Sequence, residues 1–125
     1  MNINYYLANI YTKNGTKYPN LDCWRLVCFW FLNEKGIKLN TYASATTEDF
    51  EKLKGEMLDN CVIKEIEEPK EGCIIAVLQG GITTHVGIYT HKKFLHANNK
   101  GTYLIPLERF TNKTKFKIKY YEVIA

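Results

Sequence analysis

The residues of this chain whose types and spacing could do covalent chemistry are one cysteine and two histidines. Cys23 lies in the segment LDCWRLV, His85 opens the apolar run HVGIY, and His96 lies near the end of the run FLHA. A thiol needs a nearby base to become a nucleophile at neutral pH, and a third polar group best holds that base in place. The three residues supply this set, which predicts a cysteine hydrolase.

Cys23 is predicted to lie in the first turn of a helix that spans about residues 23–35. Asp22 can cap this helix and Gly36 can end it. Unpaired N–H groups and the positive end of the helix dipole favour a thiolate over a thiol there, and the same groups can bind an oxyanion. The alternative is that Cys23 is an ordinary small buried residue. That description fits the other three cysteines better: Cys28, Cys61 and Cys73.

The two histidines are expected on the two strands of one hairpin, residues 85–90 and 93–97, which His91 and Lys92 connect. A lone histidine in a buried strand is more often a core residue than a catalyst, but the presence of Cys23 reverses this expectation. Across the hairpin, His96 can share a hydrogen bond with the distal ring nitrogen of His85 and fix its tautomer. His91, at the tip, is expected in solvent.

The remaining pattern predicts helices first and strands second. The first twenty residues read as loops, and a second helix is expected over residues 47–59, where apolar residues recur at helical spacing. After Pro69 the pattern changes to strands, at residues 73–79, the hairpin, 103–106 and 116–120. Helices followed by a meandering antiparallel sheet give an α+β fold class.

Size and composition suit one domain that spans residues 1–125. Hydrophobic residues make up 46% of the chain, which is enough for a core. A net charge of +4 is mild: it suits an anionic partner such as a bacterial wall polymer without demanding one, and no nucleic-acid partner is expected. Four lysines at period-two spacing are expected on the solvent face of the last strand: Lys113, Lys115, Lys117 and Lys119.

Targeting and cofactor signals are weak throughout. No apolar run approaches the ~20 residues that span a bilayer, and the N-terminus has no basic region followed by a long apolar segment. We therefore expect no membrane span and no Sec-type signal peptide, with synthesis in a cytoplasm. The cysteines have no framework spacing, and the chain has no CxxC or HxxxH pair, so disulfides, a metal site and an organic cofactor are not expected.

The segments DCWRLV, HVGIY and FLHA together resemble the NlpC-type cell-wall cysteine peptidases, closest to the short forms of phage tails, over roughly residues 5–108. The resemblance implies a papain-like fold in which the nucleophile helix precedes a small antiparallel sheet. It implies Cys23 as nucleophile, His85 as base and His96 as orienting residue. Members of this family typically cleave amide bonds in peptidoglycan stem peptides, often between D-glutamate and a diamino acid.

The resemblance also implies substrate contacts around the nucleophile. A tyrosine about a dozen residues before the cysteine often hydrogen-bonds near it in this family; Tyr11 matches best and Tyr18 second. Asp22, Trp24 and Arg25 are expected to line the substrate site. Arg25 stands where the family usually has Gly or Ser, so it either grips a substrate carboxylate or obstructs the groove.

The expected function is therefore a peptidoglycan endopeptidase carried by a virion tail, beside other tail-tip or hub proteins, where it opens the wall locally during genome entry. One alternative is a mainly structural tail-tip or assembly protein with little turnover, for which Arg25 is the hint. The other alternative is a different thiol reaction on the same scaffold, such as acyl transfer or an antibacterial toxin.

Overall fold

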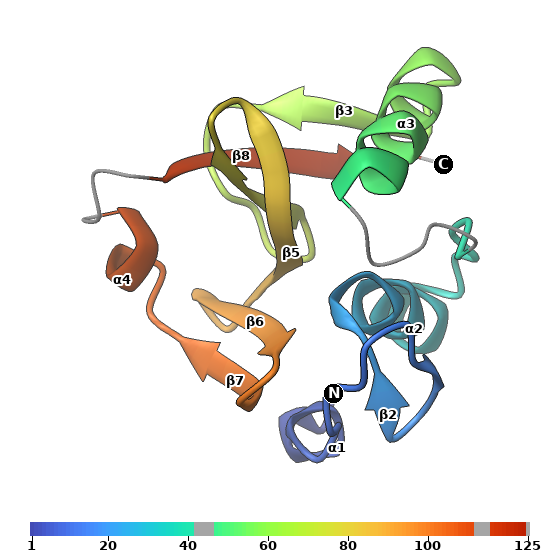
Figure 1. Ribbon diagram of the computed structural model, residues 1–125, viewed down its shortest axis with the longest axis vertical. Coiled ribbons are helices and arrows are strands. Elements are labelled where there is room, and N and C mark those ends of the chain that lie inside the picture. Colours follow the sequence, from blue (N-terminus) through green and yellow to red (C-terminus); the bar gives the residue numbers. More distant parts are fainter. Residues whose placement is uncertain (42–46, 112–115, 125) are drawn as a thin grey trace.

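Six antiparallel strands form the sheet at the centre of the computed structural model, which describes residues 1–41, 47–111 and 116–124 (Figure 1). The strand order is β3-β8-β4-β5-β6-β7, and every neighbouring pair is antiparallel. The strands are β3 Ile63–Ile66, β4 Ile74–Gln79, β5 Ile82–Thr90, β6 Lys93–Asn98, β7 Gly101–Ile105 and β8 Lys117–Val123. With the helices that pack on this sheet, the predicted α+β class is confirmed.

The two long helices have the predicted bounds, α2 Cys23–Lys35 and α3 Thr47–Asp59. The Asp22 carboxylate caps α2 by accepting the backbone N–H of Arg25 at 2.8 Å. Gly36, in the left-handed region with φ +67, ends the helix as expected, because glycine adopts this conformation without steric cost. None of the helices that the structure describes is long and apolar enough to cross a bilayer.

The N-terminal region is more ordered than the sequence predicted. A short helix, α1 Ile3–Leu7, begins the chain, and β1 Thr16–Lys17 pairs with β2 Asn20–Leu21 just before α2. The prediction of a loop was wrong because these elements are only one turn or one pair long, too short to show a periodic pattern. The short β3 and helix α4, Glu108–Thr111, were missed for the same reason.

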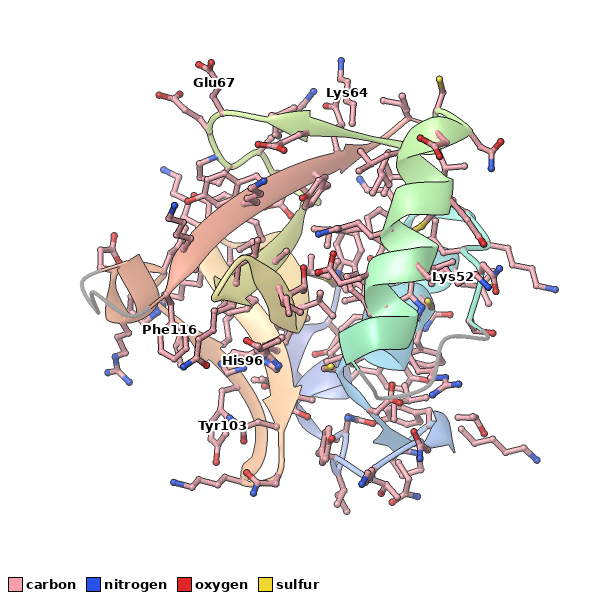
Figure 2. The ribbon with its side chains drawn as sticks, turned by 45° about the horizontal axis from the view of Figure 1, so that its top comes forward. Lys52, Lys64, Glu67, His96, Tyr103 and Phe116 are labelled. Atoms are coloured by element: carbon pink, nitrogen blue, oxygen red, sulfur yellow. The ribbon has the colours of Figure 1, made fainter. Side chains whose placement is uncertain are left out.

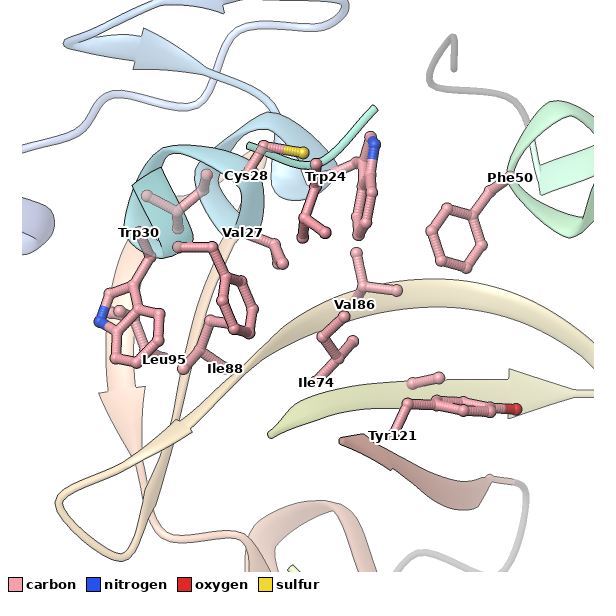
Figure 3. Close-up of a cluster of buried hydrophobic side chains, with 14 of the residues drawn as sticks. Trp24, Val27, Cys28, Trp30, Phe50, Ile74, Val86, Ile88, Leu95 and Tyr121 are labelled. Atoms are coloured by element: carbon pink, nitrogen blue, oxygen red, sulfur yellow. The ribbon is translucent and has the colours of Figure 1, made fainter. Parts of the chain in front are cut away.

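The core lies on both faces of the sheet. On one face, α2 and α3 cover the central strands: Trp24, Val27 and Trp30 of α2 contact a layer that includes Val86, Ile88 and Leu95, as Figure 3 shows. A smaller cluster fills the opposite face, built from Cys73, Ile75, Val77, Phe94 and Leu107. Residues of β5 and β6 therefore alternate between the two clusters, as side chains of a strand must.

The expected solvent face of the last strand is only partly visible. Lys117 and Lys119 lie on β8, where Lys117 is exposed and Lys119 makes a surface ion pair with Glu65 at 3.7 Å. Lys113 and Lys115 fall outside the described residues. Exposed pairs of this kind add little to stability.

Candidate active site

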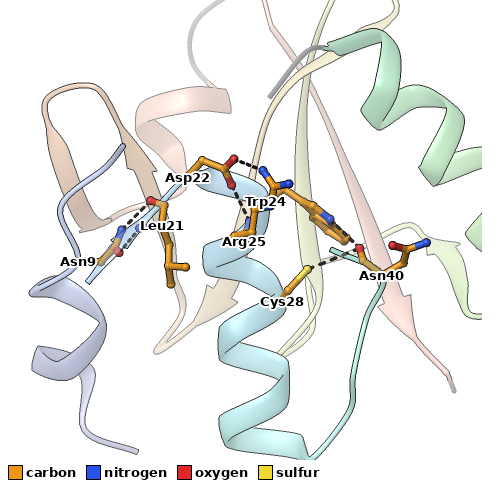
Figure 4. Close-up of polar contacts among 7 residues, drawn as sticks. All are labelled: Asn9, Leu21, Asp22, Trp24, Arg25, Cys28 and Asn40. Carbon is orange, nitrogen blue, oxygen red and sulfur yellow. Dashed lines mark hydrogen bonds and ion pairs between the residues drawn. The ribbon is translucent and has the colours of Figure 1, made fainter. Parts of the chain in front are cut away.

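Cys23 is the first residue of α2, and a buried asparagine fixes the chain just before it. Asn9 is 2% exposed; its Oδ1 accepts the Leu21 N–H at 2.8 Å and its Nδ2 donates to the Leu21 carbonyl at 3.0 Å (Figure 4). Asn9 Nδ2 also contacts Thr102 on β7 at 3.2 Å. The segment that leads into the thiol is thus held to the sheet edge by side-chain bonds, which is the rigidity that a nucleophile needs.

The thiol lies at a gap between β5 and β6. These two strands pair only at the hairpin end, from Thr90↔Lys93 to Ile88↔Leu95. The backbone N–H and carbonyl of Tyr89 both bond to the segment that leads into β4. Because backbone groups alternate in direction along a strand, the N–H of Val86, three residues earlier, points toward β6. The Val86 N–H is close enough to Cys23 to lower the pKa of its thiol. The first residue of α2 thereby lies at the place where the β5–β6 ladder stops.

The two histidines bridge the same strands from the other face of the sheet. His85 Nε2 lies 2.8 Å from His96 Nδ1, so one ring donates to the other. His96 is 3% exposed, and its ring stacks on Phe94 with centroids 4.6 Å apart (Figure 2 shows its position on β6). The predicted His85–His96 hydrogen bond is present. Among the described residues no hydrogen bond joins Cys23 to His85, and such bonds are often long in ligand-free enzymes.

A β-bulge sets the direction of His85. Val77 of β4 is opposite His85, but the next residue, Leu78, is opposite Thr83, so Thr84 has no partner in the register. Thr84 Oγ1 donates to the Val77 carbonyl at 3.2 Å. A bulge re-aims the side chains beside it and is common next to active sites.

A carboxylate on α3 anchors the strand just before this bulge. Glu51 accepts the Thr83 N–H at 2.6 Å, and Lys54 Nζ lies 2.8 Å from the same carboxylate. Burial raises the pKa of the Glu51 carboxyl, but the bonds from Lys54 and Thr83 outweigh it and hold that pKa below its ordinary value. The helix thus holds β5 two residues before His85 through a charged hydrogen bond.

Glu51→Ala is expected to lower the free energy of unfolding by about 1–3 kcal/mol, because it leaves the buried Thr83 N–H without an acceptor. Glu51→Gln keeps a carbonyl oxygen for this bond and should cost less. Urea denaturation measures both, with Glu56→Ala as the matched control, since Glu56 is an exposed carboxylate on the same helix. Equal losses for Glu51→Ala and Glu56→Ala would contradict the anchoring role.

The resting thiol is protonated, which corrects the expectation from the helix terminus. Burial raises the pKa of Cys23 to about 11, and the adjacent Asp22 carboxylate raises it too. The backbone N–H groups of Val86, Trp24 and Cys23 itself lower the pKa, as a helix N-terminus should, but they do not compensate. Desolvation has the largest effect on the pKa of Cys23 because the first turn of α2 is packed against the sheet rather than open to water.

The imidazoles are neutral in this structure. Burial lowers the pKa of His85 to about 3, with repulsion from His96 as the second cause, and burial lowers the pKa of His96 to about 4. Above these values each imidazole is in its neutral form, which is the form that a general base must have. The site therefore combines a protonated thiol at the start of α2 with a pair of neutral imidazoles on β5 and β6, and it holds no preformed thiolate–imidazolium pair.

The rate of Cys23 alkylation by iodoacetamide should rise about tenfold per pH unit from pH 7 to beyond pH 9, because only the thiolate reacts. With a pKa of about 11 the thiolate is scarce at neutral pH. The measurement uses a Cys61→Ser variant, which removes the exposed cysteine, and peptide mass mapping of Cys23. A rate that is already at its plateau below pH 8 would contradict the protonated resting state.

Three of the residues expected to bind substrate are turned inward. Asp22 is 1% exposed and Trp24 is 3% exposed, and the Trp24 indole donates to the Asn40 carbonyl at 2.9 Å (Figure 4). Arg25 Nη1 binds the Asp22 carboxylate at 2.7 Å. Direct substrate contact by Asp22 and Trp24 therefore has no support in this arrangement. Arg25, which was expected to grip a substrate carboxylate or obstruct the groove, is paired with the carboxylate that caps its own helix.

Tyr11 is the fourth expected contact, and it does lie near the nucleophile. Burial raises the pKa of Tyr11, and the nearby Cys23 and Asp22 raise it further. Tyr18, the second choice, is elsewhere: its hydroxyl donates to the Tyr5 carbonyl at 2.8 Å and its ring stacks on Phe29. The geometry favours Tyr11 over Tyr18 as the tyrosine of the site.

A pocket of about 220 Å³ ends on the two imidazoles. It is lined by Val77, Thr84, His85, His96, Asn98 and Phe116. Its walls are mainly apolar, with the Asn98 amide and the imidazoles as the polar groups that can orient a ligand. His85 is thus accessible to a small molecule from the face of the sheet that α2 does not cover.

The sequence interpretation missed several residues that position the site. Asn9, Glu51 and the Val86 amide act through hydrogen bonds to distant parts of the chain, which no local spacing reveals. Gly87 had a visible signal, a glycine inside a strand pattern, which marks a close approach of another backbone. A Cβ at Gly87 would overlap the Leu95 carbonyl oxygen and the Phe94 ring.

Comparisons with known proteins identify the family and the fold. The model of the NlpC/P60 family matches residues 8–119. A solved structure, the NlpC/p60 domain of the peptidoglycan hydrolase SagA, superposes with a TM-score of 0.61 at 14% identity, covering 96% of this chain and 90% of that one. At this identity the likeness shows the fold. A search of the curated proteins found no match.

Proposed function

The chain belongs to the NlpC/P60 family, a family of cell-wall peptidases, and from this premise we propose that it is a cysteine peptidase that hydrolyses amide bonds in peptidoglycan stem peptides. The observation that carries the proposal is the gap between β5 and β6. There the backbone of Val86 lowers the pKa of Cys23, the first residue of α2, and His85, which precedes Val86 on β5, lies 2.8 Å from His96.

In the proposed reaction His85 acts as the general base. When its Nε2 donates to His96 Nδ1, its own Nδ1 is left to accept the thiol proton as Cys23 Sγ attacks the amide carbonyl. The protonated His85 then gives this proton to the leaving amine, and a thioester remains on Cys23. Water attacks the thioester with His85 again as base, which releases the carboxylic acid and restores the thiol.

The backbone supports the negative charge that develops. The N–H groups of Cys23, Trp24 and Val86 all lower the pKa of the thiol, so they already favour negative charge at this point. In the tetrahedral intermediate the same first-turn groups are available to the oxyanion. His96 acts as an orienting residue, since its bond decides which nitrogen of His85 can accept a proton.

We further propose that the enzyme works as part of a phage tail. There it would open the cell wall locally during genome entry. The likeness of DCWRLV to short tail-borne family members supports this role. A mainly structural tail-tip protein stays the alternative; Arg25, its hint in the sequence, is paired with Asp22. Mass spectrometry of density-purified particles tests the tail assignment: the chain should copurify with tail proteins, and its presence only in the soluble lysate would overturn it.

The substrate class is tested by digesting purified sacculi from Gram-negative and Gram-positive cells. A peptidase releases new amino termini without new reducing sugar ends, and the masses of the released muropeptides identify the bond. New reducing ends would point to a glycosidase instead. No release from either wall by a folded protein would refute the proposed function.

A further inference from the structure

A cluster of three aromatic rings lies at the corner between α1 and α2, away from the thiol. Tyr5 stacks on Tyr18 with centroids 4.5 Å apart, and Tyr18 stacks on Phe29 at 5.2 Å with an interplanar angle of 9°. The centroids of Tyr5 and Phe29 are 5.9 Å apart, so the three rings form a triangle in which Tyr5 packs against both of the others, and Tyr5 is nevertheless 44% exposed. The corner therefore offers a fixed aromatic ring to solvent.

Polar side chains surround this ring in a shallow pocket of about 420 Å³, lined by Asn2, Tyr5, Tyr6, Asn33 and Glu34. The buried Tyr6 hydroxyl donates to Glu34 Oε2, and the Asn33 side chain is close enough to the same hydroxyl to lower its pKa. Burial raises the pKa of Tyr6 far above its ordinary value, with the Glu34 bond as the second cause, so the phenol keeps its proton. This network fixes the amide and the carboxylate beside the exposed ring.

We propose that this corner binds the N-acetylhexosamine rings of the wall glycan. The apolar C–H face of a pyranose packs on an aromatic ring, while amide and carboxylate groups bond the hydroxyls and the acetamido group of the sugar. Glu34 disfavours a phosphate-rich or otherwise anionic wall polymer, because like charges repel. The choice of wall glycan rests on the proposed function; the site itself rests on the aromatic cluster and the pocket.

The corner lies at the far end of α2 from the nucleophile. Ten residues separate Cys23 from Asn33, or about 15 Å along a helix axis. That is comparable to the reach of four or five extended residues. A glycan held at this corner would thus lie at a distance from Cys23 that a stem peptide attached to it can span.

The test is binding of tetra-N-acetylchitotetraose to the wild-type protein, followed by ¹H–¹⁵N NMR titration. Shift changes should centre on Tyr5, Asn33 and Glu34, and Tyr5→Ala should weaken binding about tenfold. Tyr5→Leu keeps an apolar contact on Tyr18 and should weaken binding as much, which covers the case of an unstable alanine variant. Tyr103→Ala is the matched control, since Tyr103 is a 40% exposed tyrosine on β7, and it should not change the affinity.

Two results would overturn the inference. The first is a titration without shift changes at the corner at saturating sugar. The second is an equal loss of affinity in Tyr103→Ala and Tyr5→Ala. Because binding needs no turnover, a protein that binds the sugar but cleaves no peptide contradicts only the proposed function, and one that cleaves but does not bind contradicts only this inference.

Discussion

His85→Ala is expected to lower kcat/KM for peptidoglycan peptides by at least about 10⁴-fold, while the protein stays folded. The thiol of Cys23 has a pKa raised to about 11, so without a base it is almost never a nucleophile at neutral pH. His96→Ala should cost less, on the order of 10²–10⁴-fold, because His85 keeps its basicity but loses the bond that selects its tautomer.

The control for both variants is His91→Ala, which removes the remaining histidine at the exposed hairpin turn and should leave turnover unchanged. Circular dichroism checks that each variant is folded. A His85→Ala protein with more than about a tenth of wild-type activity would contradict the role of His85 as base. An activity lost equally in all three variants would point to general damage.

Gly87→Ala is expected to lower the free energy of unfolding by about 3 kcal/mol or more. The added Cβ would overlap the Leu95 carbonyl oxygen and the Phe94 ring, and it would lie 3.0 Å from the Cβ of His96. Strand β6 must then move away from β5 where the two strands hold the imidazole pair. Activity should fall together with stability.

Gly55→Ala on α3 is the matched control, because nothing lies within 4 Å of the Cβ that it adds. Alanine is the better helix former, so this variant should gain about 0.5–1 kcal/mol. Urea denaturation measures both changes. A Gly87→Ala protein as stable and active as the wild type would show that the β5–β6 approach tolerates a methyl group.

The sequence predicted those parts of the fold that local chemistry decides. The bounds of α2 followed from a capping Asp22 and a terminating Gly36, and the hairpin followed from two apolar runs with His91 and Lys92 between them. These two residues adopt positive φ values of 55 and 59, as a two-residue hairpin turn requires. The pairing of His85 with His96 followed from their places across that hairpin.

The electrostatics of the site depend on packing between distant segments and were not predictable from spacing. A cysteine at a helix N-terminus predicts a thiolate only if the helix end faces water, and here the sheet covers it. Arg25 was expected to grip a substrate carboxylate or obstruct the groove. Instead its guanidinium pairs with the carboxylate of Asp22, one helical turn earlier. Trp24 beside the nucleophile suggested a substrate contact, but Phe50 of α3 packs against its ring with centroids 5.2 Å apart.

The most direct test of Cys23 as the nucleophile is the rate at which new amino termini appear in sacculi treated with Cys23→Ala, compared with wild type and Cys61→Ser. Cys61 is an exposed cysteine remote in sequence from the site, so Cys61→Ser controls for the loss of a thiol. We predict wild-type release with Cys61→Ser and none above the uncatalysed background with Cys23→Ala. Release by a folded Cys23→Ala protein at the wild-type rate would contradict the account.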